Sequence, residues 1–182
     1  APAAARKNAA SGGTIAGVSA SDGTVRLDEG GRSVIRERLL RERDRYGSGW
    51  THANLNVIAS PVQYVRMIFD LMPTDTPDQR ATYAARMRAV PGALVGYRDS
   101  LRWAAGRGRT SAVRQVDQCA AQCAAFGGNP DAPGFFSAAV DRFDADGDLA
   151  KELAAAARIA EHAYYDFGRF LTDELRPLAP AK

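Results

Sequence analysis

The chain has 182 residues, of which 46% are hydrophobic and 25% charged, and this is typical of one globular unit able to bury a core. Its net charge is a mild +3 and basic residues are interleaved with acidic ones, so the composition argues against a nucleic-acid-binding surface. No run of about 18 apolar residues is present, so we expect a soluble chain without a membrane-spanning segment. Two cysteines favour the reducing cytoplasm over export without deciding between them.

The N-terminal part of the chain is rich in alanine, glycine and serine. Weak alternation over residues 14–19 and 24–27, around Ser21-Asp22-Gly23, predicts a short hairpin. Residues 33–46 then predict an amphipathic helix. Its apolar residues should face inward, and they are Ile35, Leu39, Leu40 and Tyr46.

The most apolar predicted helix begins after Ser60 and ends before Pro73. Ser60, Pro61 and Gln63 fit a capping box with proline in the first turn. Apolar residues occupy almost its whole circumference, so we expect this helix to be buried on nearly every side. A narrow polar stripe remains, formed by Gln63, Arg66 and Asp70. Because buried polar groups need partners, the stripe should face another helix, a water-filled cleft or a ligand, and pairing of Arg66 with Asp70 is the structural alternative.

Further helices follow one another to the end of the chain. Caps, stops and apolar spacing predict them over residues 76–89, 91–105, 111–126, 135–143 and 149–175. The connections are short and strands do not alternate with helices, so the pattern predicts an all-α fold, an antiparallel array of six or seven helices. We divide the chain into a segment of residues 1–30, which holds the hairpin, and a helical domain of residues 31–182.

The last predicted helix carries large apolar residues on more than one face. They are Tyr164, Tyr165, Phe167, Phe170 and Leu171. One packing partner cannot bury them all. We therefore expect this end of the chain to expose apolar surface that a C-terminal continuation or a second chain covers.

No set of residues in the sequence matches a metal-binding or catalytic pattern. Cys119 and Cys123 share one helix face, and we interpret them as small core side chains rather than as half of a metal site or a strained disulfide. His52 and His162 lack neighbours at the spacing of zinc ligands. The aspartates of residues 144–148 fail the calcium-loop pattern, and a turn followed by a helix cap explains them. We expect no catalytic residue, metal or cofactor in this chain.

The segment 54–73 reads Asn-Leu-Asn-x-Ile-Ala-Ser-Pro-x-Gln-x-x-Arg-x-x-Phe-Asp-Leu-Met-Pro, and Ala85-Arg86-Met87, Val90-Pro91 and Ala93-Leu94-x-x-Tyr97 follow it. These motifs resemble a bacterial family, the domain of unknown function 885, over roughly residues 34–182. Its members resemble zinc-dependent peptidases through a His-Glu-x-x-Pro-Gly-His-type motif in their C-terminal half, which this chain lacks. The resemblance implies that the chain is the N-terminal helical part of a larger protein that binds zinc elsewhere.

Two functions follow from this resemblance and from the polar stripe. In the first, the chain is a non-catalytic part of a metal-dependent hydrolase or peptidase and supplies one wall of the substrate cleft. The residues expected on that wall are Gln63, Arg66, Asp70 and Tyr97. Arg66 would offer a planar, bidentate donor to the carboxylate of a small peptide-like substrate. In the second, the chain is a helical binding or assembly module with no enzymatic role.

Overall fold

The structure, a computed structural model, describes residues 18–21, 24–128 and 132–181. The chain divides into two compact units, Ala1–Gly47 and Ser48–Lys182, and each is described by itself. In the first unit, β1 (Val18–Ser21) pairs antiparallel with β2 (Thr24–Leu27). The second strand has the predicted bounds, whereas residues 14–17 and the predicted turn at Asp22-Gly23 lie outside the described residues.

The helix of the first unit, α1 (Glu29–Gly47), begins four residues before the predicted start at residue 33. The Asp28 carboxylate accepts a hydrogen bond from the Gly31 amide (2.6 Å) and so stabilises the earlier start. None of the α1 residues is buried, so the prediction of an inward face is wrong for this unit. The exposed apolar residues include Ile35, Leu39, Leu40 and Tyr46. A two-stranded pair is too small to cover a face of a 19-residue helix.

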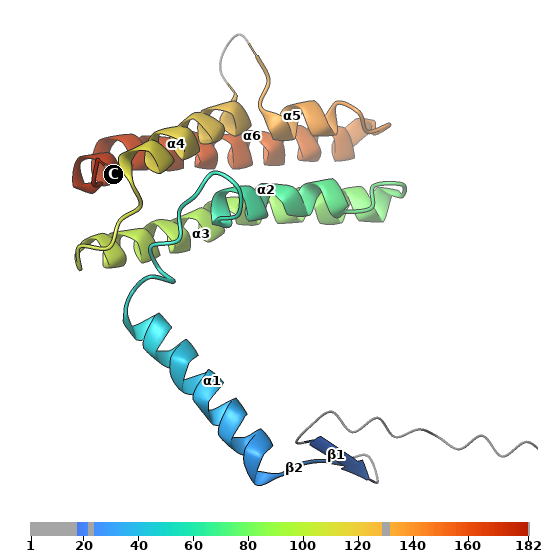
Figure 1. Ribbon diagram of the computed structural model, residues 1–182. Coiled ribbons are helices and arrows are strands. Elements are labelled where there is room, and N and C mark those ends of the chain that lie inside the picture. Colours follow the sequence, from blue (N-terminus) through green and yellow to red (C-terminus); the bar gives the residue numbers. More distant parts are fainter. Residues whose placement is uncertain (1–17, 22–23, 129–131, 182) are drawn as a thin grey trace, which may run out of the picture. The chain divides into compact units, whose positions relative to one another are not determined.

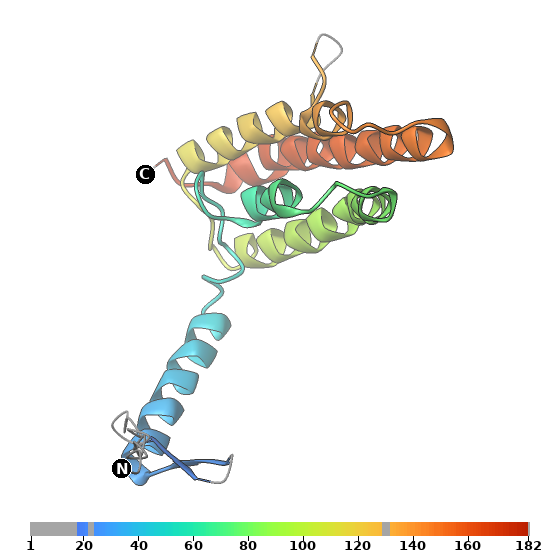
Figure 2. The same cartoon turned by 90° about the vertical axis from the view of Figure 1, so that its right-hand side faces the viewer.

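The second unit consists of helices in two layers (Figures 1 and 2). One layer holds α2 (Pro61–Leu71) and α3 (Pro77–Ala105), and the other holds α4 (Val113–Gly127), α5 (Phe135–Val140) and α6 (Gly147–Phe170). The last helix continues through a π-helical turn, η1 (Leu171–Leu175), and a 3-10 turn, η2 (Arg176–Leu178). The prediction of an all-α, multi-helix fold is confirmed. No helix in the described part of the chain combines the length and apolar character needed to span a membrane.

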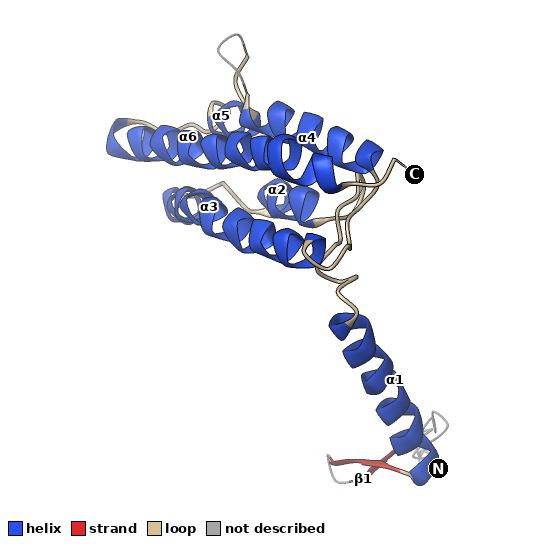
Figure 3. Ribbon diagram, turned by 90° about the vertical axis from the view of Figure 1, so that its left-hand side faces the viewer, coloured by secondary structure: helices blue, strands red, loops and turns tan. Residues whose placement is uncertain are grey.

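Ion pairs and close approaches give the directions of the packed helices (Figure 3). Arg88 pairs with Glu152 (2.6 Å) and Arg102 with Glu174 (2.7 Å), so α3 and α6 run parallel. The prediction of an antiparallel array therefore fails for this long pair. In contrast, Asp117 near the start of α4 pairs with Arg176 beyond the end of α6 (2.7 Å), so α4 and α6 are antiparallel. Helices that follow each other directly in the sequence run in opposite directions when they pack together. α3 and α6 do not follow each other directly, because α4 and α5 lie between them in the sequence.

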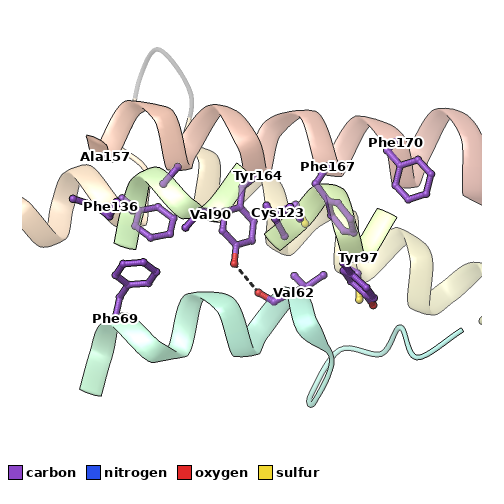
Figure 4. Close-up of a cluster of buried hydrophobic side chains, with 14 of the residues drawn as sticks. Val62, Phe69, Val90, Tyr97, Cys123, Phe136, Ala157, Tyr164, Phe167 and Phe170 are labelled. Atoms are coloured by element: carbon purple, nitrogen blue, oxygen red, sulfur yellow. Dashed lines mark hydrogen bonds between the residues drawn. The ribbon is translucent and has the colours of Figure 1, made fainter. Parts of the chain in front are cut away.

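The long helix α6 lies at the centre of the core (Figure 4). Its buried residues are Leu153, Ala156, Ala157, Ala160, Tyr164, Phe167 and Phe170. The prediction that the aromatic end of α6 exposes an apolar surface is wrong. Only Tyr165 is exposed among the five residues predicted to form that surface, which are Tyr164, Tyr165, Phe167, Phe170 and Leu171. Three helices and η1 share the burial, because α3, α4 and α5 all pack against α6. The Tyr164 hydroxyl donates to the Val62 carbonyl (2.9 Å) and so connects α6 to the start of α2.

The helix α3 runs without a break through Pro91, where we predicted the boundary between two helices. A proline inside a helix removes one backbone hydrogen bond and costs about 3 kcal/mol in an isolated helix. Buried side chains on both sides of Pro91 lie on one face of α3 and join the core, which holds the helix together. They include Met87, Val90, Leu94 and Tyr97.

The helix α2 is much less buried than its composition predicts. Among its residues only Val62 and Phe69 are buried, so the expectation of burial on nearly every side is wrong. Its outward apolar residues are Tyr64, Met67, Ile68 and Leu71, and the last of these is 77% exposed. The cap is as predicted: Pro61 opens the helix, and the Gln63 side-chain oxygen accepts from the Ser60 amide (2.8 Å).

Two helix starts differ from prediction because other hydrogen bonds use the expected caps. α4 begins after Ala112, and the Ser111 hydroxyl donates instead to the Leu55 carbonyl (2.7 Å). α6 is capped at Asp146, whereas the Asp148 carboxylate pairs with Lys151 (3.0 Å). α5 ends at Val140, three residues before the predicted end at residue 143.

Candidate functional site

Of the four residues predicted on a cleft wall, the structure brings Arg66 and Asp70 together. The Arg66 guanidinium donates a hydrogen bond to the Asp70 carboxylate one helical turn later. The same guanidinium lies over the Phe135 ring, with 4.3 Å between its central carbon and the ring centroid. Arg66 is thus held between a carboxylate and an aromatic ring of α5, and the pairing that we weighed as the structural alternative is present.

Gln63 takes part in the network that anchors the start of α2 to α4. Its side-chain oxygen accepts from the Ser60 hydroxyl (2.7 Å), and its amide nitrogen donates to the Gln122 side-chain oxygen (2.6 Å). Gln122 in turn donates to the Val57 carbonyl (3.1 Å). These bonds satisfy the hydrogen-bonding groups of Gln63 internally, which leaves it a structural position.

Tyr97 lies in the core, away from the Arg66–Asp70 pair. Its ring stacks on Phe167, with 5.2 Å between the ring centroids. Figure 4 shows the two rings side by side. The Tyr97 hydroxyl donates to the Asn54 carbonyl. Burial raises the pKa of Tyr97 above its ordinary value. This residue fixes the loop before α2 to α3 and does not extend the polar stripe.

A pocket of about 310 Å³ lies beside the Arg66–Asp70 pair, where the end of α2 meets the first half of α3 and α5. We call it the α2–α5 pocket. Its lining residues are Phe69, Asp70, Met72, Thr74, Tyr83, Phe135, Ala139, Arg142 and Phe143. Of these residues, only Asp70 is predicted at such a site from the sequence. Tyr83 and Arg142 belong to other elements, and no pattern along α2 indicates them.

Tyr83 is the buried polar residue of the α2–α5 pocket. It is 2% exposed, and its ring packs edge-on against Phe69 and Phe143, both at 5.1 Å. Its hydroxyl has no hydrogen-bond partner among the residues that the structure describes. The hydroxyl oxygen itself is not fully enclosed, so it reaches the open space of the pocket and can donate to water or to a ligand.

The charges around Tyr83 are close enough to affect its titration. Burial raises the pKa of Tyr83 to about 12, and the Asp70 carboxylate contributes in the same direction. The guanidinium groups of Arg142 and Arg66 act in the opposite direction. At neutral pH the hydroxyl is therefore protonated and able to donate a hydrogen bond.

Arg142 supplies the positive charge that is not neutralised within the pocket. Its side chain forms no ion pair or hydrogen bond with any other residue in the described ranges, and it is exposed. Arg66 and Asp70 neutralise each other, so Arg142 leaves the pocket with a local charge of about one positive unit. No sequence motif marks Arg142, which follows a six-residue helix in an ordinary-looking turn.

The cysteines and histidines do not form a reactive centre with this pocket. Cys119 and Cys123 are buried and unlinked, as predicted, and burial raises the pKa of Cys119 to about 11. His162 pairs with Asp166 on the surface of α6 (3.0 Å), and His52 packs on Trp103 (4.5 Å between ring centroids). No group of three or more His, Cys, Asp or Glu residues lies together in the part of the chain that the structure describes.

The profile of a family described as "Bacterial protein of unknown function (DUF885)" matches residues 2–182. The chain belongs to this family. The match begins well before residue 34, so DUF885 includes the N-terminal segment in which we saw no resemblance. The α2–α5 pocket lies inside the DUF885 match, whose description states no activity. A comparison with curated proteins found no match.

Proposed function

We propose that the chain is a non-catalytic helical part of a metal-dependent hydrolase or peptidase, and that the α2–α5 pocket forms one wall of its substrate cleft. The observation that carries this proposal is the Tyr83 hydroxyl, which has no partner among the described residues and lines a pocket together with Arg142, whose side chain is also unpaired in those residues. Groups of this kind bind and orient a substrate. By the family resemblance, zinc and the general base would belong to another part of the complete protein.

The proposal changes the role expected for Arg66. One amino group of this guanidinium pairs with Asp70 and its face lies over the Phe135 ring, although its Nε is buried without a partner. The side chain of Arg142 has no partner in the described residues and lines the pocket. Arg142 is therefore the better donor to a substrate carboxylate, and Arg66 positions Asp70 and the aromatic wall. Gln63 and Tyr97 act as structural residues outside the pocket.

The test is steady-state kinetics of the complete protein on peptide-like substrates. Arg142→Gln should raise KM by about tenfold or more and change kcat little, since it removes a charge-assisted hydrogen bond that binds substrate. Arg158→Gln is the matched control, because Arg158 is an exposed arginine of α6 outside the pocket. Equal KM values for the two variants, or no hydrolytic activity in the zinc-loaded complete protein, would contradict the proposal.

The second candidate is a binding or assembly module, and a separate observation favours it. The outward residues of α2 form an exposed apolar face, and a groove of about 360 Å³ lies between this face and α3. The groove is lined by Ile68, Leu71, Met72, Pro73, Gln79, Thr82 and Arg86. Exposed apolar surface of this kind is typical of a contact with another protein surface.

Sedimentation velocity of the Ile68→Asp variant of the complete protein separates the two candidates. A changed assembly state with unchanged hydrolysis would favour the assembly module. An unchanged assembly state, together with the KM effect of Arg142→Gln, would favour the cleft wall.

A further inference from the structure

We infer that the α2–α5 pocket binds a singly charged carboxylate joined to an aromatic ring, with Arg142 pairing with the carboxylate and the Tyr83 hydroxyl donating to it. This inference rests on the proposed function of the pocket as a binding site and adds the chemical class of the ligand. It is carried by the charges, the unpartnered donor and the aromatic walls of the pocket.

The donor set fits an anion. Tyr83 is almost completely buried, and its hydroxyl lacks an acceptor among the described residues. Its ring is fixed by edge-on contacts with Phe69 and Phe143, so the hydroxyl has little freedom to seek another partner. Arg142 lines the same pocket and is near enough to influence the titration of Tyr83. A hydroxyl and a guanidinium that line one pocket can together bind the oxygens of a carboxylate.

The local charge favours one negative unit over two. Arg66 and Asp70 are paired, and Arg142 remains as the single unbalanced cation of the pocket. A carboxylate balances this charge, whereas a phosphate dianion would add an unbalanced negative charge close to Asp70. A metal cation fits poorly, because the one carboxylate of the pocket already has a guanidinium partner.

The aromatic part of the wall can contact a ring of the ligand. Phe69, Phe135 and Phe143 line the pocket beside a wall surface that is otherwise mainly polar. The rings of this region already pack edge-to-face, for example Phe69 with Phe136, whose centroids are 5.1 Å apart. Figure 4 shows these two rings next to each other. An aromatic ring of a ligand continues this arrangement. The volume of about 310 Å³ lies at the lower end of the range for small-molecule pockets, roughly 300–1,000 Å³.

The experiment is isothermal titration of the complete protein with three matched probes. They are phenylacetate, the neutral phenylacetamide, and phenyl phosphate, which is mainly a dianion above pH 7. We expect saturable binding of phenylacetate with a Kd on the order of 1 mM, as for a small fragment. Phenylacetamide should bind at least about tenfold more weakly, because it cannot form the charge-assisted bonds. Equal binding of phenylacetamide, tighter binding of phenyl phosphate, or no saturable binding of phenylacetate would overturn the inference.

Two variants locate the bound probe. Tyr83→Phe keeps the ring and its packing and removes only the hydroxyl, and it should weaken phenylacetate binding about threefold to tenfold. Arg142→Gln should weaken it about tenfold or more. Arg158→Gln is the control and should bind phenylacetate as the unaltered protein does. Circular dichroism and the unfolding midpoint of each variant establish that it is folded, and unchanged binding in both folded pocket variants would overturn the inference.

The outcome is distinguishable from that of the proposed function. If phenylacetate binds through Tyr83 and Arg142 but Arg142→Gln leaves the KM for peptide-like substrates unchanged, the ligand class stands and the cleft-wall proposal fails. If Arg142→Gln raises KM while phenylacetate does not bind, the cleft wall stands and the ligand class fails.

Discussion

The helices α2 and α6 show opposite relations between composition and burial. α2 has the more apolar sequence, yet two of its 11 residues are buried. α6 carries many alanines and charged residues, yet seven of its 24 residues are buried and it lies between α3 and α4. The helix that the sequence marks as central is thus at the periphery of the core, and the alanine-rich helix is at its centre.

Side-chain size decides which helix can have several close neighbours. Ala156, Ala157 and Ala160 are fully buried, and small residues at these positions let another helix approach closely. Gly168 of α6 faces α4, and a β-carbon added there would lie 3.2 Å from the β-carbon of Cys123, so α4 also approaches closely. α2 lacks small residues on its outer face, and the other helices of residues 48–182 leave that face largely exposed.

The largest expected effect is on the α6 side of the comparison. Phe167→Ala should lower the free energy of unfolding by about 3–5 kcal/mol, because it empties a site 3% exposed between Tyr97 and Phe170. Urea denaturation measures the change. The control is Tyr165→Ala, which removes an aromatic ring from the exposed side of the same helix. Similar losses of unfolding free energy in the two variants would contradict the assignment of Phe167 to the buried face of α6 and Tyr165 to its exposed face.

Enlarging a buried alanine tests whether small size matters. Ala160→Leu should destabilise the fold by about 1–3 kcal/mol, because a fully buried and packed position cannot accept extra methylene groups without strain. Ala155→Leu is the matched control, since Ala155 borders an open surface pocket of about 470 Å³. Thermal unfolding followed by circular dichroism compares the pair. A destabilisation confined to Ala155→Leu would refute the close packing of α6.

Removing one hydroxyl tests how much a single hydrogen bond between α6 and α2 contributes to stability. Tyr164→Phe keeps the buried ring and removes the bond from its hydroxyl to the Val62 carbonyl (2.9 Å). The expected loss is about 1 kcal/mol, as for a typical intramolecular hydrogen bond. Denaturant midpoints are sensitive to a change of this size. A stabilised variant would mean that this bond does not help to hold α2 on α6.

The smallest effect is expected on the outer face of α2. Leu71→Ser should change the free energy of unfolding of residues 48–182 by no more than about 0.5 kcal/mol, because Leu71 is 77% exposed. Urea denaturation of that unit provides the measurement. The same measurement on the complete protein tests whether another surface covers α2. A loss of unfolding free energy above about 2 kcal/mol there would show that it does.

Local sequence patterns predict much of the helical structure of residues 48–182. The spacing of apolar residues predicted the all-α class, and the capping boxes at Ser60 and Thr76 predicted the starts of α2 and α3. The i,i+4 spacing of Arg66 and Asp70 made their pairing foreseeable. These features depend on residues within one or two helical turns, and such contacts are encoded in neighbouring positions of the chain.

Tertiary structure alone decided which helix faces are covered and where the pocket lies. Packing on both sides of Pro91 keeps α3 continuous although proline disfavours a helix interior. The α2–α5 pocket joins Asp70, Tyr83 and Arg142, which come from three separate segments. Whether a residue is buried, and whether its donor group has a partner, depends on which residues lie opposite it in space. That information is a property of the assembled helices, and a periodic pattern along one helix does not contain it.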